Sequence, residues 1–445
     1  MKGQVKHMSQ RKRYAVVGTG GRSVMFIDAV AGEYSKYAEL VGFCDTSPTR
    51  MGYYNKYIGE KHKHAPVSTY SPQQFDQMVK ENKVDVVIVT SMDSTHHQYI
   101  IRAMELGCDA ISEKPMTTDA PKARAIFDTI AKTGKHLRVT FNYRYAPSST
   151  KVRELIMQGV VGRPLAVDFS WVLDTRHGAD YFRRWHRQKE NSGGLLVHKA
   201  THHFDLINWW IDSYPQRVFA MGELKFYGQK NANARGQKYD YDRYTFQEKA
   251  KNDPFRLVLN EDPITKQLYL DAEKDSGYIR DRNVFNADIT SEDTMSVTAR
   301  YRNGVIFNYS LIAYSPWEGY RVSVTGDKGR IELYDQHGSH IIRGQSDDEL
   351  AAEQAQGEHQ ELRVFPMFGR PYDVAIPKAE GGHGGGDPIL LQQIFSPNPP
   401  ADPFHRAASQ LDGAASILMG ISANESIRTG LPVDCDDLLK LPEKK

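Results

Sequence analysis

Over the first 145 residues, short apolar runs alternate with helix-like stretches, and this alternation constrains the fold more than any other feature of the chain. The run 86–89, Val-Val-Ile-Val, is too short for a typical helix and rich in β-branched residues, as a strand buried on both faces should be. Strands that alternate with helices predict βαβ units and a parallel sheet covered on both sides. We therefore expect an α/β domain with a doubly wound parallel sheet over residues 1–145.

The rest of the chain carries the pattern of antiparallel strands. Apolar and polar residues alternate over 295–301, and Asn303-Gly304 is a strong hairpin signal directly after them. We expect residues 146–445 to form an α+β domain with an open, mainly antiparallel sheet. Within this domain, the polar, tyrosine-rich stretch 229–282 is predicted to be an insertion and residues 404–428 a closing C-terminal helix.

The charge balance and the cysteines restrict partners and compartment. The 57 basic and 55 acidic side chains leave a formal charge of +2, without the excess of Lys and Arg that nucleic-acid binding needs. No run of about 18 apolar residues exists, so we expect no membrane helix. The basic start 1–13 leads into no apolar signal-peptide core, and the three cysteines are widely spaced with no disulfide pattern. These features predict a cytoplasmic protein.

A glycine-rich loop, Gly18-Thr-Gly20-Gly21-Arg22-Ser23, follows the first predicted strand and opens a helix. In this setting glycines let the backbone approach a pyrophosphate at the helix N-terminus, and Ser23 is small enough to replace the third glycine. Asp45 ends the second predicted strand, 24 residues after Gly21, where a carboxylate can accept both ribose hydroxyls of NAD. Arg50 lies nearby and leaves NADP open. The loop and the acid predict a dinucleotide-binding Rossmann domain with NAD as its cofactor.

Glu113-Lys114-Pro115 follows another predicted strand, 110–112. It therefore lies at the carboxyl edge of the parallel sheet, where ligands bind in such folds. A lysine at this edge can polarise or deprotonate a substrate hydroxyl next to the nicotinamide. Lys114 is accordingly a candidate catalytic residue.

The densest polar cluster is the stretch from Gly193 to Asp205. As one continuous helix it would place His198, His202 and Asp205 on one face, by their i, i+4 and i+7 spacing, with His203 pointing the other way. Two histidines one turn apart also suit a metal ion. The glutamate of the HExxH zinc motif is missing, however, and nicotinamide chemistry needs no metal, so we predict none.

A second glycine-rich segment, Gly381 to Asp387, precedes a predicted helix at 388–394. It lacks the Lys-Ser/Thr pair of a phosphate-binding Walker motif. We expect it to close onto the site through its backbone and the His383 ring, with a flexible surface linker as the alternative.

Taken in this order, the glycine loop, Asp45, Glu113-Lys114-Pro115 and the Gly-Gly…His…Asp run resemble the Gfo/Idh/MocA family of glucose–fructose oxidoreductase, inositol dehydrogenase and rhizopine-catabolism relatives. The resemblance covers nearly the whole chain. It implies that Lys114 and His202 are catalytic. Members usually carry Asp-x-x-x-His as partners of the lysine, and this chain has His198 where they have the aspartate, so a catalytic role carries over to His198 with altered chemistry.

The resemblance also implies two sets of binding residues. Segment 90–97 is similar to the family's segment over the cofactor, 142–145 to its entry into the second domain, and 185–187 to substrate-facing residues of its sugar-active members. The expected cofactor-binding residues are Gly18, Gly20, Gly21, Arg22, Ser23, Asp45, Arg50, Thr90, Ser91, His96, Glu113 and Lys114. The expected substrate-binding residues are Asn142, Arg144, Trp185, Arg187, Lys199, His203, Asp205 and His383.

Three functions fit these features. The first is an NAD(P)-dependent oxidoreductase that transfers hydride from a hydroxyl of a sugar, glycoside or polyol. The second is an NAD-dependent glycoside hydrolase that oxidises a ring carbon transiently and keeps its NAD tightly bound. The third, a regulatory or scaffold protein with a dead site, is disfavoured by the presence of both Lys114 and His202. We expect a small carbohydrate as substrate and, by analogy, a homodimer or homotetramer.

Overall fold

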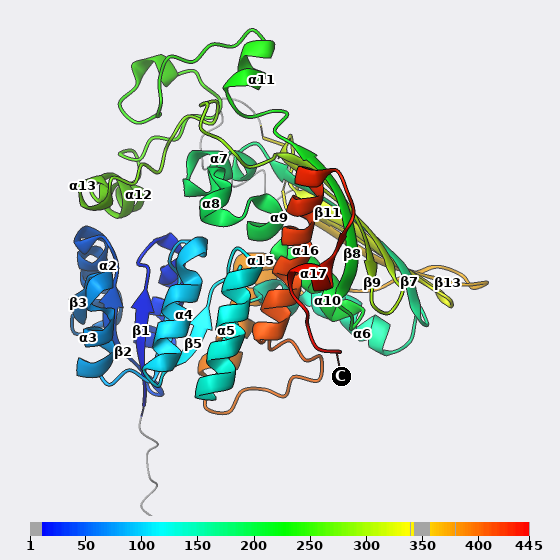
Figure 1. The fold of residues 1–445 in the computed structure, drawn as a ribbon, viewed down its shortest axis with the longest axis horizontal. Coiled ribbons are helices and arrows are strands. Elements are labelled where there is room, and N and C mark those ends of the chain that lie inside the picture. The colour runs from blue at the N-terminus through cyan, green and yellow to red at the C-terminus, as the bar shows by residue number, and fades with distance from the viewer. Residues whose placement is uncertain (1–10, 339, 342–356, 379, 445) are drawn as a thin grey trace, which may run out of the picture.

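The computed structural model describes residues 11–338, 340–341, 357–378 and 380–444, and they form two sheets with helices packed against them (Figure 1). The first sheet is entirely parallel, with the order β3-β2-β1-β4-β5-β6. Its strands are β1 (Lys12–Val17), β2 (Ala38–Cys44), β3 (Ser68–Tyr70), β4 (Val86–Val89), β5 (Asp109–Ser112) and β6 (Leu137–Val139). The predicted doubly wound α/β domain is confirmed. The expectation for the start of the chain falls mainly on residues 1–10, which lie outside the described ranges.

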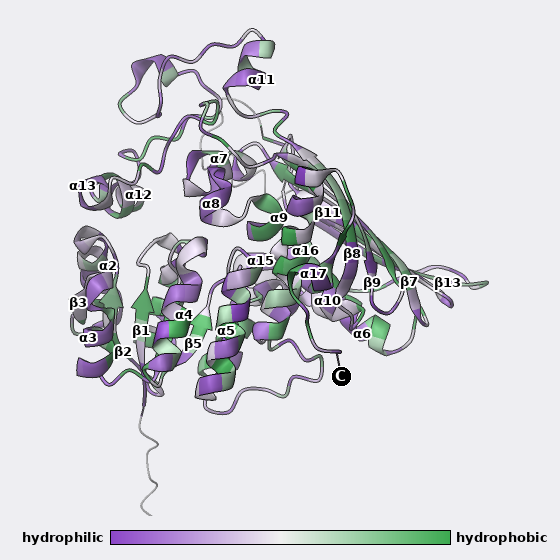
Figure 2. Cartoon of the chain, viewed as in Figure 1, coloured by the Kyte–Doolittle hydropathy of each residue, from purple (hydrophilic) through white to green (hydrophobic). Residues whose placement is uncertain are grey.

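Helices cover both faces of the first sheet, and local chemistry sets their ends. In α5 the Asp119 side chain accepts a hydrogen bond from the Lys122 N–H at the start, and Gly134 adopts a left-handed conformation after the last turn. Figure 2 shows β1 and β5 as hydrophobic strands between partly hydrophilic helices. The segments of this domain are η1 (Gly21–Ser23), α1 (Val24–Asp28), η2 (Ala29–Glu33), α2 (Pro48–His62), η3 (Pro72–Gln74), α3 (Phe75–Glu81), η4 (Asp93–Thr95), α4 (His96–Glu105) and α5 (Ala120–Thr133).

The second sheet has the order β14-β13-β12-β11-β7-β10-β9-β8-β15, and only the β7–β10 pair is parallel among its described strands. Buried and exposed residues alternate along β9, as the sequence predicts. Its strands are β7 (Pro164–Asp174), β8 (Pro215–Glu223), β9 (Thr294–Tyr301), β10 (Ile306–Ser315), β11 (Gly319–Gly326), β12 (Gly329–Gln336), β13 (His359–Pro366), β14 (Tyr372–Asp373) and β15 (Val433–Asp434). The predicted open, mainly antiparallel sheet is confirmed.

One face of this sheet packs against helices, and the opposite face is polar and open. The open face has a hollow of about 760 Å³ lined by residues such as Ser170, Ser296 and Asn308. Association into a homodimer or homotetramer through this face stays a prediction.

The helical segments of the domain outside the excursion defined below are η5 (Asn142–Tyr145), α6 (Pro147–Met157), α7 (His177–Arg183), η6 (Trp185–Arg187), α8 (Lys189–Ser192), α9 (Leu195–His198), α10 (Thr201–Trp210), α15 (Gly382–Phe395), α16 (Gln410–Thr429) and α17 (Cys435–Leu438).

The long connection between β8 and β9, residues 224–293, contains the predicted insertion; we call it the excursion. It reaches from the second sheet to the carboxyl edge of the first, where α12 and α13 lie above α2 (Figure 1). An aromatic cluster that includes the buried Tyr227 and Phe285 and the half-buried Phe226 stabilises its base. Its helical segments are α11 (Gln229–Ala234), η7 (Glu248–Ala250), α12 (Pro263–Thr265), η8 (Lys266–Leu270) and α13 (Glu273–Ser276).

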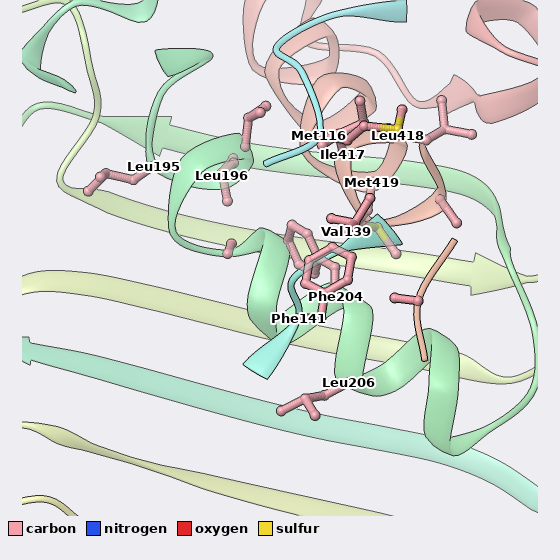
Figure 3. Close-up of a cluster of buried hydrophobic side chains, with 14 of the residues drawn as sticks. Met116, Val139, Phe141, Leu195, Leu196, Phe204, Leu206, Ile417, Leu418 and Met419 are labelled. Carbon is pink, nitrogen blue, oxygen red and sulfur yellow. The ribbon is translucent and has the colours of Figure 1, made fainter. Parts of the chain in front are cut away.

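The C-terminal helix α16 lies between the two sheets and contacts both domains. It begins at Gln410 instead of the predicted 404, because Ser409 caps it in a capping box with Asp412. Figure 3 shows apolar side chains of the first domain, α9, α10 and α16 packed in one cluster. Its labelled members are Met116, Val139, Phe141, Leu195, Leu196, Phe204, Leu206, Ile417, Leu418 and Met419. The two domains therefore share a hydrophobic core.

The histidine-rich stretch does not form the single helix that the sequence suggests. Helix α9 ends at His198, and α10 begins at Thr201 after a break in which the Ala200 N–H bonds to the Leu195 carbonyl oxygen. This hydrogen bond spans five residues instead of four, so an extra residue enters the turn and the single i, i+4, i+7 face predicted for His198, His202 and Asp205 does not form.

Among the described residues, none of the helices combines the length and apolarity that a membrane span requires. All three cysteines are buried as free thiols, and burial raises the pKa of Cys44 to about 12, of Cys108 to about 11 and of Cys435 to about 12.

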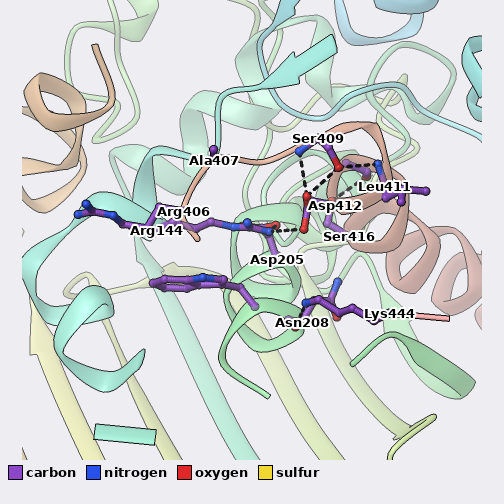
Figure 4. A network of polar contacts seen from close by, with 12 residues as sticks. Arg144, Asp205, Asn208, Arg406, Ala407, Ser409, Leu411, Asp412, Ser416 and Lys444 are labelled. Carbon is purple, nitrogen blue, oxygen red and sulfur yellow. Dashed lines mark hydrogen bonds and ion pairs between the residues drawn. The ribbon is translucent and has the colours of Figure 1, made fainter. Parts of the chain in front are cut away.

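A buried ionic network joins η5, α10 and α16 (Figure 4). Arg144 donates to both carboxylate oxygens of Asp205, at 2.7 and 2.5 Å, and to Asp412 at 3.0 Å. The side chains of Arg144 and Asp205 are 2 % and 1 % exposed. Both residues were expected to bind substrate. The structure instead pairs them in the interior, outside the lining of the second cavity at the carboxyl edge of the first sheet, and Asp412 of α16 completes the network.

We predict that Asp205→Asn lowers the free energy of unfolding by about 3–5 kcal/mol, because it leaves the buried Arg144 charge without its main partner. Urea denaturation monitored by circular dichroism measures this change. Asp434→Asn, which breaks the exposed pair between Arg217 and Asp434, is the matched control and should leave the unfolding midpoint almost unchanged. Equal midpoint shifts in both variants would contradict the prediction.

Candidate active site

A cleft of about 550 Å³ lies at the carboxyl edge of the first sheet, between that sheet, the segments α7 to α9 and the excursion. Fourteen of the predicted site residues line it. They are Gly18, Gly20, Gly21, Arg22, Asp45, Arg50, Thr90, Ser91, His96, Glu113, Lys114, Trp185, His198 and His383.

The glycine loop has the shape that a dinucleotide requires. Gly18 has φ +85°, and a Cβ at this position would lie 2.6 Å from the Ser91 backbone, so only glycine fits between β1 and β4. Around Gly20 a Cβ would meet nothing within 4 Å, which leaves its backbone open to a ligand. Ser23 is buried and does not line the cleft; its hydroxyl donates to the Gly20 carbonyl oxygen at 2.7 Å and shapes the loop. The loop fits a pyrophosphate at the start of the first helix.

Asp45 lies at the end of β2 and is held firmly. One carboxylate oxygen accepts hydrogen bonds from the Thr19 N–H and hydroxyl, at 2.5 and 2.9 Å. The other accepts from the Ser47 N–H at 2.8 Å and from Arg50 at 2.6 Å. The carboxylate is thereby fixed beside the glycine loop, where it fits the adenosine ribose of NAD.

A polar chain connects the first domain to the second glycine-rich segment. Arg22 donates to Glu113 at 2.9 Å and lies 3.8 Å from Asp387. Asp387 also accepts from Asn142 at 2.7 Å and bonds with His383 at 3.0 Å. Asn142 therefore positions this segment from outside the lining of the cleft. His383 and the two glycines after it have positive φ, so regular helix in α15 begins only beyond them.

Lys114 and His198 come from different domains and face the same cleft. Burial lowers the pKa of Lys114 below its usual value; Arg22 and Arg184 act in the same direction, against Glu113 and Asp93. The Lys114 ammonium lies 3.4 Å from the His198 carbonyl oxygen. His96 helps to hold this region, since its ring bonds to the carbonyl oxygens of Pro115 and Ser91 at 2.8 and 3.0 Å.

His198 pairs with a carboxylate that sequence reasoning missed. Its Nδ1 bonds to Asp93 Oδ2 at 2.5 Å, and both side chains are buried. Burial and the nearby Lys114 lower the pKa of His198 well below its usual value, so the ring is neutral, and the cations Lys114 and Arg184 favour the carboxylate form of Asp93. A neutral ring that donates from Nδ1 to Asp93 keeps Nε2 unprotonated, as we assign from this hydrogen bond.

Aromatic rings surround His198. His186 contacts it edge to face at a centroid distance of 4.2 Å, Tyr181 lies 5.5 Å away, and Trp185 stacks on His186 at 3.6 Å. Such rings present flat, largely apolar surfaces beside the imidazole. Only Trp185 among these three was predicted as a site residue.

Four other predicted residues, His202, Lys199, His203 and Arg187, do not line the cleft. His202 is buried and packs edge to face on Tyr143 at 4.8 Å, and burial lowers its pKa well below the usual value. Lys199 lies 4.7 Å over the Trp171 ring, and burial lowers its pKa to about 8.

His203 and Arg187 also face the interior of the second domain. His203 stacks on Trp171 at 4.0 Å and bonds to the Tyr309 hydroxyl at 2.6 Å, the arrangement of a core histidine. Arg187 is buried and pairs with Asp288 of the excursion at 2.5 Å. Neither side chain contributes to the lining of the cleft, and their roles in substrate binding stay predictions.

Residues that sequence reasoning missed line the cleft as well. Asp93 follows β4 and lies in segment 90–97, which resembles the family's segment over the cofactor. Its position after a parallel strand could therefore have identified it as a site residue. His186 lies within segment 185–187, whose resemblance to substrate-facing residues was a signal for it as well. The others gave no local signal because tertiary packing brings them in: Tyr181, Arg184, Tyr269, Ser276 and Tyr278. Among the described residues, no group of three His, Cys, Asp or Glu side chains is arranged to hold a metal ion.

Comparison with known proteins places the chain among oxidoreductases. Residues 12–141 match the family profile described as GFO_IDH_MocA, oxidoreductase family, NAD-binding Rossmann fold. Residues 153–435 match the profile of the same family's C-terminal alpha/beta domain. The two matches together cover most of the chain.

Individual relatives agree with these profiles. YteT of Bacillus subtilis, described as an oxidoreductase, is 34% identical over 424 residues, covering 94% of this chain and 96% of its own. The D-glucoside 3-dehydrogenase of Escherichia coli is 32% identical over 196 residues, which cover 43% of this chain and 52% of its own.

A solved structure shows the same fold. The WlbA dehydrogenase from Bordetella pertussis, in complex with NADH and UDP-GlcNAcA, superposes with a TM-score of 0.64 at 17% identity, over 98% of this chain and 99% of that one. Together with the glycine loop and Asp45 at the carboxyl edge of a parallel sheet, the profiles show that the chain belongs to the Gfo/Idh/MocA family of oxidoreductases, with NAD as its cofactor.

Proposed function

We propose that the protein oxidises a hydroxyl of a sugar, glycoside or polyol and passes the hydride to NAD. The observation that carries the proposal is the pairing, in one cleft, of Lys114 at the carboxyl edge of the first sheet with the Asp93–His198 pair. The aromatic rings around His198 and the glucoside dehydrogenase among the relatives favour a carbohydrate substrate.

The residues around Lys114 prepare it to move a proton. When bound, NAD supplies the hydride acceptor. Lys114, whose amine is partly shielded from water and whose pKa is lowered, accepts the proton of the substrate hydroxyl as the carbinol is oxidised. His198 offers an unprotonated Nε2 to a neighbouring hydroxyl and is held in that tautomer by Asp93. His202 packs on Tyr143 and supports its position, and it does not line the cleft.

A second candidate function is redox-neutral glycoside hydrolysis. It proceeds by oxidation of a ring carbon, elimination of the aglycone, addition of water and reduction of the same carbon. Elimination needs a proton-transfer group distinct from the one that handles the oxidised hydroxyl. The Asp93–His198 pair is such a group and is separate from Lys114. This observation supports the glycoside hydrolase as the second candidate function.

Incubation of the purified protein with NAD and a panel of free sugars, polyols and nitrophenyl glycosides tests the proposal. We expect NADH absorbance to rise with at least one class of substrate. Release of nitrophenol without net NADH would identify the hydrolase instead. Absence of both signals over the whole panel would contradict both functions.

Lys114→Met tests the role of the lysine in this assay, because it removes the amine and keeps a side chain of similar length. We expect kcat to fall by about 10²–10⁴-fold, the usual contribution of a general acid–base group, with NAD affinity nearly unchanged. A large loss of NAD affinity would show that Lys114 holds the cofactor instead.

The pH dependence follows from the lowered pKa of Lys114. The base must be the neutral amine, so kcat/KM for oxidation should rise with pH as the ammonium loses its proton, with a midpoint below 10.5. His198 stays neutral over this range because its pKa is lowered below 6.5. A pH–rate profile measures the limb. If Lys114→Met retains the same limb in its residual activity, another group is the base.

Asp93 is expected to act through His198. Asp93→Asn should lower kcat by about 10²-fold, because it removes the carboxylate that fixes the imidazole tautomer. His198→Gln should cost at least as much. The double variant should lose no more than His198→Gln alone, since the two residues work as one unit. Losses that multiply in the double variant would show that Asp93 has an independent role.

A further inference from the structure

The excursion forms a wall of the nucleotide end of the cleft. Tyr269, Ser276 and Tyr278 line the cleft together with the glycine loop and Asp45. The Tyr269 hydroxyl accepts a hydrogen bond from the Gly21 N–H at 2.9 Å, the kind of donor that a Rossmann loop offers to a pyrophosphate oxygen. A segment inserted between two strands of the second sheet therefore lies directly over the cofactor site.

One side chain of the excursion reaches the N-terminus of α2. Asp275 Oδ2 accepts hydrogen bonds from the Ser47 hydroxyl at 2.5 Å and from the Thr49 N–H at 3.1 Å. Ser47, the N-cap residue, in turn accepts from the Arg50 N–H at 3.1 Å. Burial raises the pKa of Asp275, but the hydrogen bonds from Ser47 and Thr49 outweigh it and lower the pKa overall. Asp275 is thus a carboxylate anion seated where α2 would otherwise attract an anion.

This position matters because of the way Rossmann domains separate NAD from NADP. The acid at the end of the second strand binds the 2′-hydroxyl of NAD, whereas a nearby arginine receives the 2′-phosphate of NADP. Here Arg50 is the arginine in question, and it donates to Asp45 at 2.6 Å. Its Nε is buried without a partner among the described residues. A 2′-phosphate at Arg50 would meet the Asp45 carboxylate directly, and the Asp275 carboxylate already occupies Ser47 and Thr49, the N-cap and second residue of the helix that carries Arg50.

We propose that Asp275 makes the site selective for NAD over NADP, by placing a carboxylate of the excursion at the N-terminus of α2 where a 2′-phosphate would bind. The excursion thereby acts as a specificity element for the cofactor. The inference rests on the nucleotide site and not on the substrate, so it is tested by binding in the absence of any sugar. Failure of the substrate assignment leaves it intact.

Titration calorimetry of the full-length protein with NAD and with NADP tests the proposal. The wild-type protein should bind NAD at least about tenfold more tightly. In Asp275→Asn, which keeps the side-chain size and removes the charge, the ratio of the two dissociation constants should fall by about five- to tenfold, mainly through tighter NADP binding at Arg50. Asp275→Ala, which removes charge and volume, should lower the ratio at least as far.

Asp271→Asn is the matched control. Asp271 lies four residues earlier in the excursion, is partly exposed and bonds to Lys266 at 2.8 Å, so its loss changes the net charge equally and removes none of the hydrogen bonds to α2. The ratio should stay within about twofold of wild type. Melting curves of all variants identify any that fail to fold.

Asp45→Asn provides a test that leaves Asp275 in place. If Asp275 contributes, this variant should still prefer NAD, although less strongly. Three results would overturn the proposal: wild-type protein that binds NADP as tightly as NAD, an unchanged ratio in a folded Asp275 variant, or complete loss of the preference in Asp45→Asn.

Discussion

The close packing of α16 against both domains fixes the distance between the two halves of the site. At Gly413 an added Cβ would lie 3.0 Å from the Met116 side chain, and at Gly420 it would lie 2.3 Å from the Leu196 carbonyl oxygen. Met116 is two residues after Lys114, and Leu196 is two residues before His198. The two glycines are seven residues apart, about two helical turns, and so lie on one face of the helix. This glycine face works as a spacer, since interiors packed at crystal-like density transmit even small changes in volume.

The bases of the site and the histidine behind them are enclosed by protein, and this enclosure favours their neutral forms. Burial lowers the pKa values of Lys114, His198 and His202, because each would carry its positive charge in a weakly polar surrounding. Only Asp93 and Glu113 lie close enough to Lys114 to oppose this effect among the causes that shift its pKa. Neutral amines and imidazoles can accept protons. The burial that destabilises their charged forms therefore also favours the forms that act as bases.

Features that depend on neighbouring residues could be predicted from the sequence. The parallel sheet, the glycine loop, Asp45 and Lys114 all follow from strand ends and short spacings, and the structure brings them together in one cleft. The predicted face of His198, His202 and Asp205 was wrong because the spacing assumes a continuous α-helix, and the wider turn after His198 shifts the residues that follow. Asp93 and Asp275 were missed as partners of His198 and α2, since those contacts join residues more than 100 positions apart.

The excursion leaves and re-enters the sheet at nearly the same place. It connects β8 and β9, which are adjacent antiparallel strands, and Asp293 at its end accepts hydrogen bonds from the N–H groups of Lys225, Phe226 and Tyr227 at its start. In topological terms it is a hairpin loop that has grown. Such a loop can be lengthened, shortened or exchanged during evolution while the strand order stays the same, so the cover of the nucleotide site can diverge independently of the scaffold that carries the catalytic lysine.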